Sequence, residues 1–171
     1  MPHWYNSIMV AIDKNSFFWQ YLSEGQRGLI EGGLYLLEDT KNHPDVRITD
    51  YSYLVFPFAK AYEGFLKKLF LDLNFISPKE YGSDHFRIGK ALNPHLEKRL
   101  RRWSIYDKIV RLGGKELADT FWFVWKRGRN LVFHYFPHNL KALTIIDAEE
   151  IIESIVNVMQ KGVTECRIKD L

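Results

Sequence analysis

Apolar residues recur every three to four positions along most of the chain, which is the spacing of an α-helix. The alternation typical of half-buried strands is almost absent. The clearest stripe consists of Phe58, Tyr62, Phe65, Leu66, Leu69, Phe70 and Leu73. The pattern therefore predicts an all-α fold.

Start and stop signals divide this pattern into about five helices. The predicted ranges are 16–40, 50–74, 95–112, 115–134 and 147 onward, with Asp50 and Asp147 as N-terminal caps. Glycines within 25–33 predict close helix packing or a local break in the first helix. Residues 76–94 predict an ordered loop with one helical turn near 88–92. Residues 143–146 are expected to form an extended loop or the approach to the last helix. Short connections between these helices favour an antiparallel bundle.

Composition is that of one globular unit, predicted as a single domain over residues 1–171 with an N-terminal arm at 1–14. The net charge is only +3, so a site for a polyanion must come from local clustering. Cys166 is the only cysteine, which excludes an internal disulfide and a multi-cysteine zinc site. The start of the chain lacks an export signal, and no apolar run approaches the roughly 18 residues of a membrane span. We therefore expect a cytoplasmic protein without membrane association.

The most informative segment is the aromatic stretch 121–138, which carries Arg127, Arg129, Asn130 and His134 among apolar residues. On an ideal helix Asn130 and His134 share a face, whereas Arg129 lies about 140° from His134. Histidine transfers protons near neutral pH, and the arginine fork matches phosphate oxygens, so the set suits cleavage of an RNA phosphodiester. The alternative is a histidine at a helix end with solvated arginines.

The run Arg129-Asn130-Leu131-Val132-Phe133-His134 resembles the R-x4-6-H signature of the HEPN ribonucleases, in which a polar residue commonly follows the arginine. Arg127 also satisfies the looser spacing, but only Arg129 is followed directly by Asn130. The resemblance implies a HEPN-like helical fold, an RNA substrate, and no metal or cofactor. It also implies a homodimer in which Arg129 and His134 of two subunits build a composite site.

A second run, Lys60-Ala61-Tyr62-Glu63-Gly64, resembles the R-x-x-E-G segment of the toxin domain in RNase LS-type antiphage toxins. The resemblance implies that Glu63 belongs to the catalytic set and that Lys60, which stands in place of the arginine, contacts RNA. It also implies a role as a toxin or phage-defence effector, with an antitoxin protein as a possible partner.

Other polar clusters have weaker interpretations. Arg101 and Arg102 could follow an RNA backbone with Trp103 as a stacking platform, or simply form a solvated helix face. His134 and His138 are four residues apart, but Pro137 argues against joint ligation on a helix, so we predict no metal site. Trp4, Trp19, Trp122 and Trp125 are expected in the core rather than against bases.

The sequence thus predicts a metal-independent endoribonuclease that uses the 2′-OH of its substrate as nucleophile. The catalytic candidates are Arg129, His134, Asn130 and Glu63, and the RNA-binding candidates are Lys60, Arg127, Arg101 and Arg102. Two alternatives stay open. One is a HEPN module that binds RNA, a nucleotide or a protein without catalysis, and the other is a helical interaction protein in which Arg129 and His134 satisfy core or interface contacts.

Overall fold

The computed structural model describes residues 12–166 and 168, and the regular structure of these residues is entirely helical, which confirms the all-α prediction. Five helices have nine or more residues: α2 (Glu24–Asn42), α3 (Ser52–Asp72), α6 (Ile105–Gly113), α7 (Lys115–Trp125) and α8 (Ile145–Glu165). Shorter elements are α1 (Phe17–Tyr21), α4 (Pro78–Tyr81), α5 (Ile88–Ala91), the 3₁₀-helices η1 (Lys98–Trp103) and η3 (Pro137–Asn139), and the π-helix η2 (Lys126–Leu131). Most of the predicted arm at 1–14, including Trp4, lies outside the described residues.

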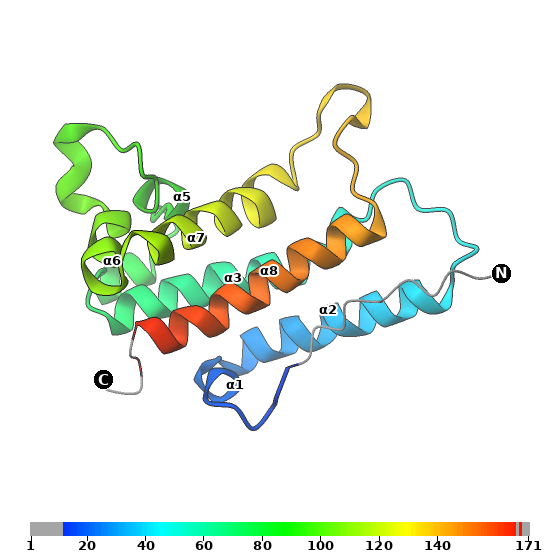
Figure 1. Ribbon diagram of the computed structural model, residues 1–171, viewed down its shortest axis with the longest axis horizontal. Helices are drawn as coiled ribbons and strands as arrows, with labels where there is room; N and C mark the ends of the chain where they lie inside the picture. Colours follow the sequence, from blue (N-terminus) through cyan, green and yellow to red (C-terminus); the bar gives the residue numbers. More distant parts are fainter. Residues whose placement is uncertain (1–11, 167, 169–171) are drawn as a thin grey trace.

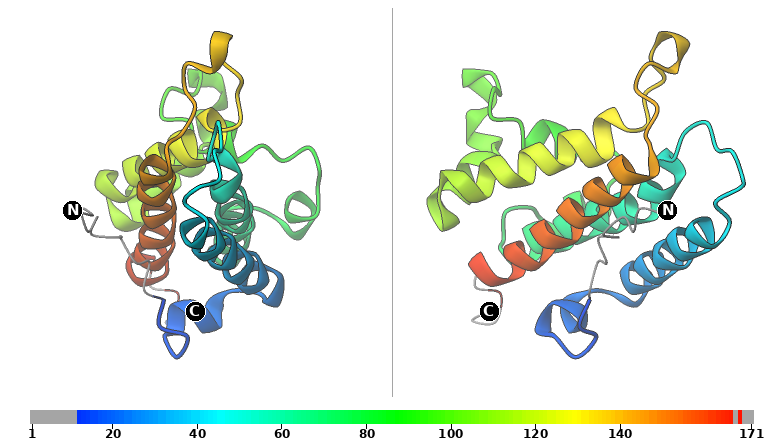
Figure 2. Two further views of the ribbon diagram at one scale, coloured as in Figure 1. Left: turned by 90° about the vertical axis from the view of Figure 1, so that its right-hand side faces the viewer. Right: turned by 45° about the vertical axis from the view of Figure 1, so that its right-hand side comes forward.

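The long helices lie side by side, with α2 and α8 both packed against α3 (Figure 1). α3 and α8 run in the same direction, whereas α2 and α7 run in the opposite one (Figures 1 and 2). A continuous hydrophobic cluster fills the space between them, and its largest fully buried side chains include Tyr62, Phe58, Phe65, Phe70 and Phe121. Trp19 and Trp125 are buried in this cluster, and Trp122 packs against it, as predicted. Among the described helices, none is long and apolar enough to cross a membrane.

A break after Leu22 divides the first predicted helix, 16–40, into α1 and α2. The Ser23 side chain accepts a hydrogen bond from the Gln26 backbone N–H at 3.2 Å, and Gln26 Oε1 accepts one from the Ser23 N–H at 3.0 Å. This reciprocal capping box satisfies two backbone donors and starts a new helix. The sequence prediction allowed a local break at glycines 25–33, but the break lies before them, because Ser23 and Gln26 form a start signal there.

Asp50 joins the beginnings of α3 and α8. Its carboxylate accepts hydrogen bonds from the backbone N–H groups of Ser52 at 2.9 Å and Leu143 at 3.2 Å. The Tyr51 N–H also donates to the Leu143 carbonyl at 3.1 Å. Burial opposes ionisation of Asp50, but these hydrogen bonds outweigh it and lower the pKa of the carboxyl group. Two helices that are distant in sequence therefore start from the same point.

Three other boundaries differ from the sequence prediction. The predicted helix 95–112 is divided into η1 and α6, and Ser104 caps α6 by accepting from the Asp107 N–H at 3.0 Å. α8 begins at Ile145 with Thr144 as its cap, and Asp147 occupies the third position of that capping box. α3 begins at Ser52 with Tyr51 rather than Asp50 at the N-cap position. The hydroxyl groups of Ser104 and Thr144 accept the capping hydrogen bonds that start α6 and α8.

The closest approach of α2 to α3 occurs at Gly33. A Cβ atom there would lie 2.8 Å from Phe58 Cζ and 2.9 Å from Pro57 Cγ, and Phe58 is fully buried. The adjacent Gly32 has no atom within 4 Å of the same position, apart from its own helix. Of these two neighbours, only Gly33 is needed for helix packing.

We expect Gly33→Ala and Gly32→Ala to change stability in opposite directions. The first should lower the free energy of unfolding by about 1–3 kcal/mol, because the fixed Phe58 ring cannot move aside. The second should raise it by about 0.5–1 kcal/mol, since alanine is more stable than glycine at an exposed position inside a helix. Urea unfolding followed by circular dichroism measures both, and destabilisation of equal size by the two variants would contradict this packing.

Candidate functional site

The segment that carries the R-x4-6-H resemblance changes its helical geometry. α7 ends at Trp125, and η2 continues it as a π-helix, in which hydrogen bonds span five residues instead of four. After Leu131 the chain turns, and the His134 N–H donates to the Leu131 carbonyl at 3.3 Å. The prediction of a helix through His134 was wrong at this end, because η2 ends at Leu131 and the chain turns there.

Gly128 fixes how η2 lies in the fold. It is buried, and a Cβ atom would lie 3.0 Å from Ile155 Cδ1 and 3.3 Å from Ile151 Cγ2 of α8. The missing side chain lets η2 press directly against α8. The two arginines that flank this glycine then pair with different helices.

Arg129 pairs with α3, where its Nε lies 3.3 Å from Glu63 Oε2. The guanidinium carbon also lies 5.8 Å from the centre of the Trp125 ring. Arg127 instead pairs with α8, and its Nη2 lies 3.3 Å from Glu150 Oε2. The fold thus unites Arg129 with Glu63 across 66 positions of sequence, and it directs Arg127 to another surface.

A groove of about 430 Å³ lies beside the Arg129–Glu63 pair. Its lining comes from α3 and from the chain around η2, and comprises Phe56, Ala59, Lys60, Glu63, Arg129 and Phe133. Lys60 precedes Glu63 by three residues, so the two side chains share the same face of α3. The groove therefore combines two cations and one carboxylate with aromatic walls.

Asn130 and His134 form a pair next to this groove. His134 Nε2 lies 3.4 Å from Asn130 Oδ1, and both residues are exposed. An amide oxygen only accepts, so this contact is a hydrogen bond in the tautomer that carries its proton on Nε2, in which Nδ1 is the acceptor. Asn130 lines a neighbouring cavity of about 450 Å³ together with Glu63 and Arg129, whereas His134 lines neither of these two hollows. The histidine follows Phe133, which lines the groove, but does not line the groove itself.

The remaining two candidates lie elsewhere. Arg101 and Arg102 belong to the exposed 3₁₀-helix η1, and neither lines the groove. The guanidinium carbon of Arg102 lies 5.0 Å from the centre of the Trp103 ring, so the two form a cation–π contact. The structure brings Lys60, Glu63 and Arg129 together, with Asn130 and His134 adjacent, and leaves Arg101, Arg102 and Arg127 outside.

Sequence reasoning missed the aromatic walls of the groove. Phe56 and Phe133 meet edge to face with ring centres 5.8 Å apart, although their side chains are 53% and 38% exposed. A signal was present, because Phe56 precedes Lys60 by four residues and Glu63 by seven, which places all three on one helical face. Phe133 carried no such signal, since its position depends on the turn after η2.

Among residues 12–166 and 168, no group of three or more His, Cys, Asp or Glu side chains is placed to hold a metal ion. Cys166 is buried, and desolvation raises the pKa of its thiol to about 12. Since the thiolate is the nucleophilic form, this cysteine is unsuited to nucleophilic chemistry.

The chain matches no protein-family model, no curated protein and no solved structure. The HEPN resemblance therefore stays a prediction, and the arguments for function depend on the residues of the groove themselves.

We expect Glu63→Gln to leave stability nearly unchanged. The Arg129–Glu63 pair is 42% and 34% exposed and shares a single hydrogen bond, so its loss should cost less than about 1 kcal/mol. Glu150→Gln is a matched control, because the Arg127–Glu150 pair has the same 3.3 Å separation and similar exposure. Urea unfolding of both variants tests this, and a loss above about 2 kcal/mol for Glu63→Gln alone would identify the pair as structural.

Proposed function

We propose that this protein is a metal-independent, HEPN-like endoribonuclease whose active site is the groove between α3 and η2. The observation that supports this most is the meeting of Arg129 and Glu63, which come from two separate motif-like segments and lie 3.3 Å apart. An arginine with no role beyond contact with solvent would have no reason to pair with a carboxylate of α3 in a groove that Lys60 and two aromatic side chains also line.

Arg129 is suited to hold the scissile phosphate. Its bond to Glu63 uses Nε, and phosphate binding would use the two terminal nitrogens of the guanidinium fork. Glu63 orients the arginine by accepting a hydrogen bond from its Nε, and Lys60 adds a second positive charge to the lining of the groove. The pentacoordinate transition state gathers negative charge on the phosphate oxygens, so fixed cations stabilise it more than the ground state.

His134 is suited to proton transfer. With Nε2–H directed to Asn130, its Nδ1 can take the proton of the RNA 2′-OH as that oxygen attacks the adjacent phosphorus. The P–O bond to the 5′-oxygen then breaks, that oxygen takes a proton from a water molecule, and His134 returns its proton to the solvent, so the strand ends in a 2′,3′-cyclic phosphate and a 5′-hydroxyl. The attacking oxygen belongs to the RNA, so this chemistry requires no metal-bound water.

The position of His134 favours a composite site in a homodimer. The histidine lies outside the groove of its own subunit but on an exposed turn beside it, where Tyr135 is 79% exposed. A two-fold axis near η2 would bring the His134 of one copy to the Arg129 of the other. A cytoplasmic toxin or phage-defence effector that is restrained by an antitoxin protein is the biological setting that we propose.

We expect Arg129→Ala and His134→Ala each to reduce RNA cleavage by at least about 100-fold without loss of folding. Both side chains lie outside the packed core, so truncation should remove transition-state stabilisation and leave helicity and the melting temperature nearly unchanged. Arg47→Ala and His43→Ala are matched controls in the exposed loop after α2 and should cleave normally. Wild-type cleavage by Arg129→Ala or His134→Ala would reject the site and favour RNA binding without catalysis.

Mixing the two inactive variants tests the composite site directly. Random exchange of subunits makes half of the dimers mixed, and each mixed dimer holds one intact Arg129–His134 combination across the interface. The mixture should therefore recover about a quarter of wild-type activity. No recovery, with subunit exchange verified by mass spectrometry, would place both residues in one subunit's site.

We expect cleavage to persist in excess EDTA and to leave cyclic phosphate and 5′-hydroxyl ends. The 2′-OH is the nucleophile in this mechanism, so a single 2′-deoxy nucleotide before the scissile bond should block the reaction. End-group analysis by mass spectrometry distinguishes the outcomes. Cleavage that stops with chelator and leaves 5′-phosphate ends would replace this mechanism with metal-assisted hydrolysis.

A further inference from the structure

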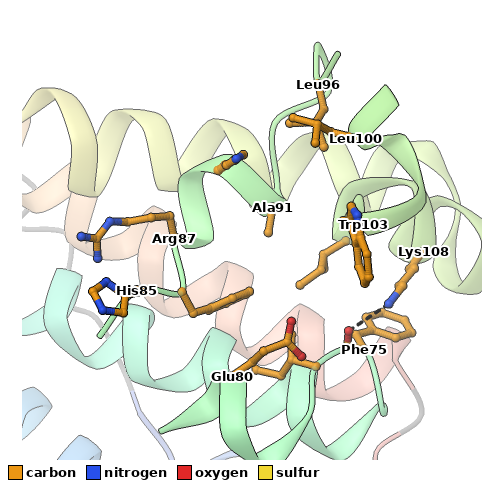
Figure 3. A pocket seen from close by; sticks show the side chains of 13 residues that line it. Phe75, Glu80, His85, Arg87, Ala91, Leu96, Leu100, Trp103 and Lys108 are labelled. Carbon is orange, nitrogen blue, oxygen red and sulfur yellow. Dashed lines mark hydrogen bonds between the residues drawn. The ribbon is translucent and has the colours of Figure 1, made fainter. Parts of the chain in front are cut away.

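A separate cavity of about 320 Å³ lies between the α4–α5 region, η1 and α6. Aromatic side chains line it from three segments, namely Phe75, Phe86 and Trp103. Figure 3 shows Trp103 descending from η1 toward Phe75 and Lys108 on one side, with Arg87 and His85 on the opposite side. Trp103 is 60% exposed although its ring borders the cavity. The volume falls at the lower end of the range for small-molecule sites, about 300–1,000 Å³.

The charge around this cavity is mainly positive. Arg87, Lys90 and Lys108 contribute three cations, and Arg102 lies against the outer part of Trp103. The one carboxylate, Glu80, accepts hydrogen bonds from the backbone N–H and the hydroxyl of Ser77, both at 2.8 Å. These hydrogen bonds lower the pKa of Glu80 and keep it charged, so three cations against one carboxylate leave the lining with a net positive charge that favours an anion.

The cavity borders a hollow of the candidate active site. Phe86, Arg87 and Lys90 line both this cavity and the neighbouring hollow that reaches Glu63, Arg129 and Asn130. α5 and the two residues before it therefore form the partition between the two spaces. A strand with its phosphate near Arg129 would pass this partition before it reached the aromatic cavity.

We propose that this cavity binds one unpaired nucleotide, with its base against Trp103 and its phosphate toward Arg87 and Lys90. The chemistry common to all occupants is an aromatic base that carries a phosphate, supplied either by an RNA strand or by a free nucleotide. Assignment to the RNA substrate rests on the proposed function, whereas nucleotide binding itself does not. Aromatic stacking accepts any base, and the cations follow the backbone, which is how single strands are commonly held.

Binding to a strand that cannot be cleaved tests this proposal apart from catalysis. The probe is a fluorescein-labelled hexaribonucleotide methylated at every 2′-oxygen, followed by fluorescence anisotropy. Trp103→Ala should weaken binding about 5- to 150-fold, the range for loss of one stacked base, and Trp103→Phe should restore most of it. Phe123→Ala is the matched control, because Phe123 is 58% exposed on α7 and lines none of these cavities.

The Arg87→Gln variant tests whether the positive charge on the partition contributes to binding of the strand. Loss of one phosphate contact should reduce the slope of log affinity against log salt concentration by about 1. Arg47→Gln, in the loop after α2, should leave the slope unchanged.

Calorimetry with AMP, GMP, CMP and UMP identifies the source of the ligand. Tighter binding of the strand than of any mononucleotide assigns RNA, and equal or tighter binding of a mononucleotide assigns a free nucleotide.

The two proposals fail separately. Binding of the methylated strand through Trp103, without cleavage of ordinary RNA, would retain the nucleotide cavity and reject the nuclease. Cleavage of RNA together with unchanged binding by both Trp103→Ala and Arg87→Gln would reject the cavity and retain the nuclease. Absence of binding to both strand and mononucleotides would overturn the cavity proposal.

Discussion

The burial of α3 is the constraint on which the rest of the structure depends. α2, α8 and η2 all pack against this helix, and Phe58, Tyr62 and Phe65 are fully removed from solvent. The edge that carries Phe56 and Lys60 remains exposed, and the hollow beside that edge is the groove. The location of the candidate site therefore follows from which side of the central helix the other helices leave uncovered. Polar groups on that side can be arranged for chemistry without a cost to the core.

Arg129 and His134, the two main residues of the proposed mechanism, are held in place by the fold to different degrees. Arg129 lies on η2, which is held against α8 by the contact of Gly128 with Ile151 and Ile155, and its partner lies on the most buried helix. His134 lies on the turn that follows, where its side chain contacts Asn130. In the proposed mechanism the phosphate cradle is therefore preorganised within one subunit, and contact with a second copy would order the proton-transfer group.

Periodicity predicted the helical class and most of the long helices, because burial of apolar stripes is a strong and local signal. The break at Ser23 and the start of α6 at Ser104 were missed, since a single hydroxyl decides whether a turn continues or restarts. The motif segments indicated Glu63 and Arg129, but whether they meet depends on long-range packing of α3 against η2. The π-helix itself left no pattern in the sequence, since it results from how residues around Gly128 fit against α8.

The dependence of η2 on α8 has a consequence for how the protein is made. Ribosomes synthesise a chain from its N-terminus, so α8 is made after α3 and η2. While α8 is still within the exit tunnel, η2 lacks the contact of Gly128 with Ile151 and Ile155 that helps to hold Arg129 opposite Glu63. The groove is thus completed only after α8 has left the tunnel, which delays whatever activity it has during synthesis.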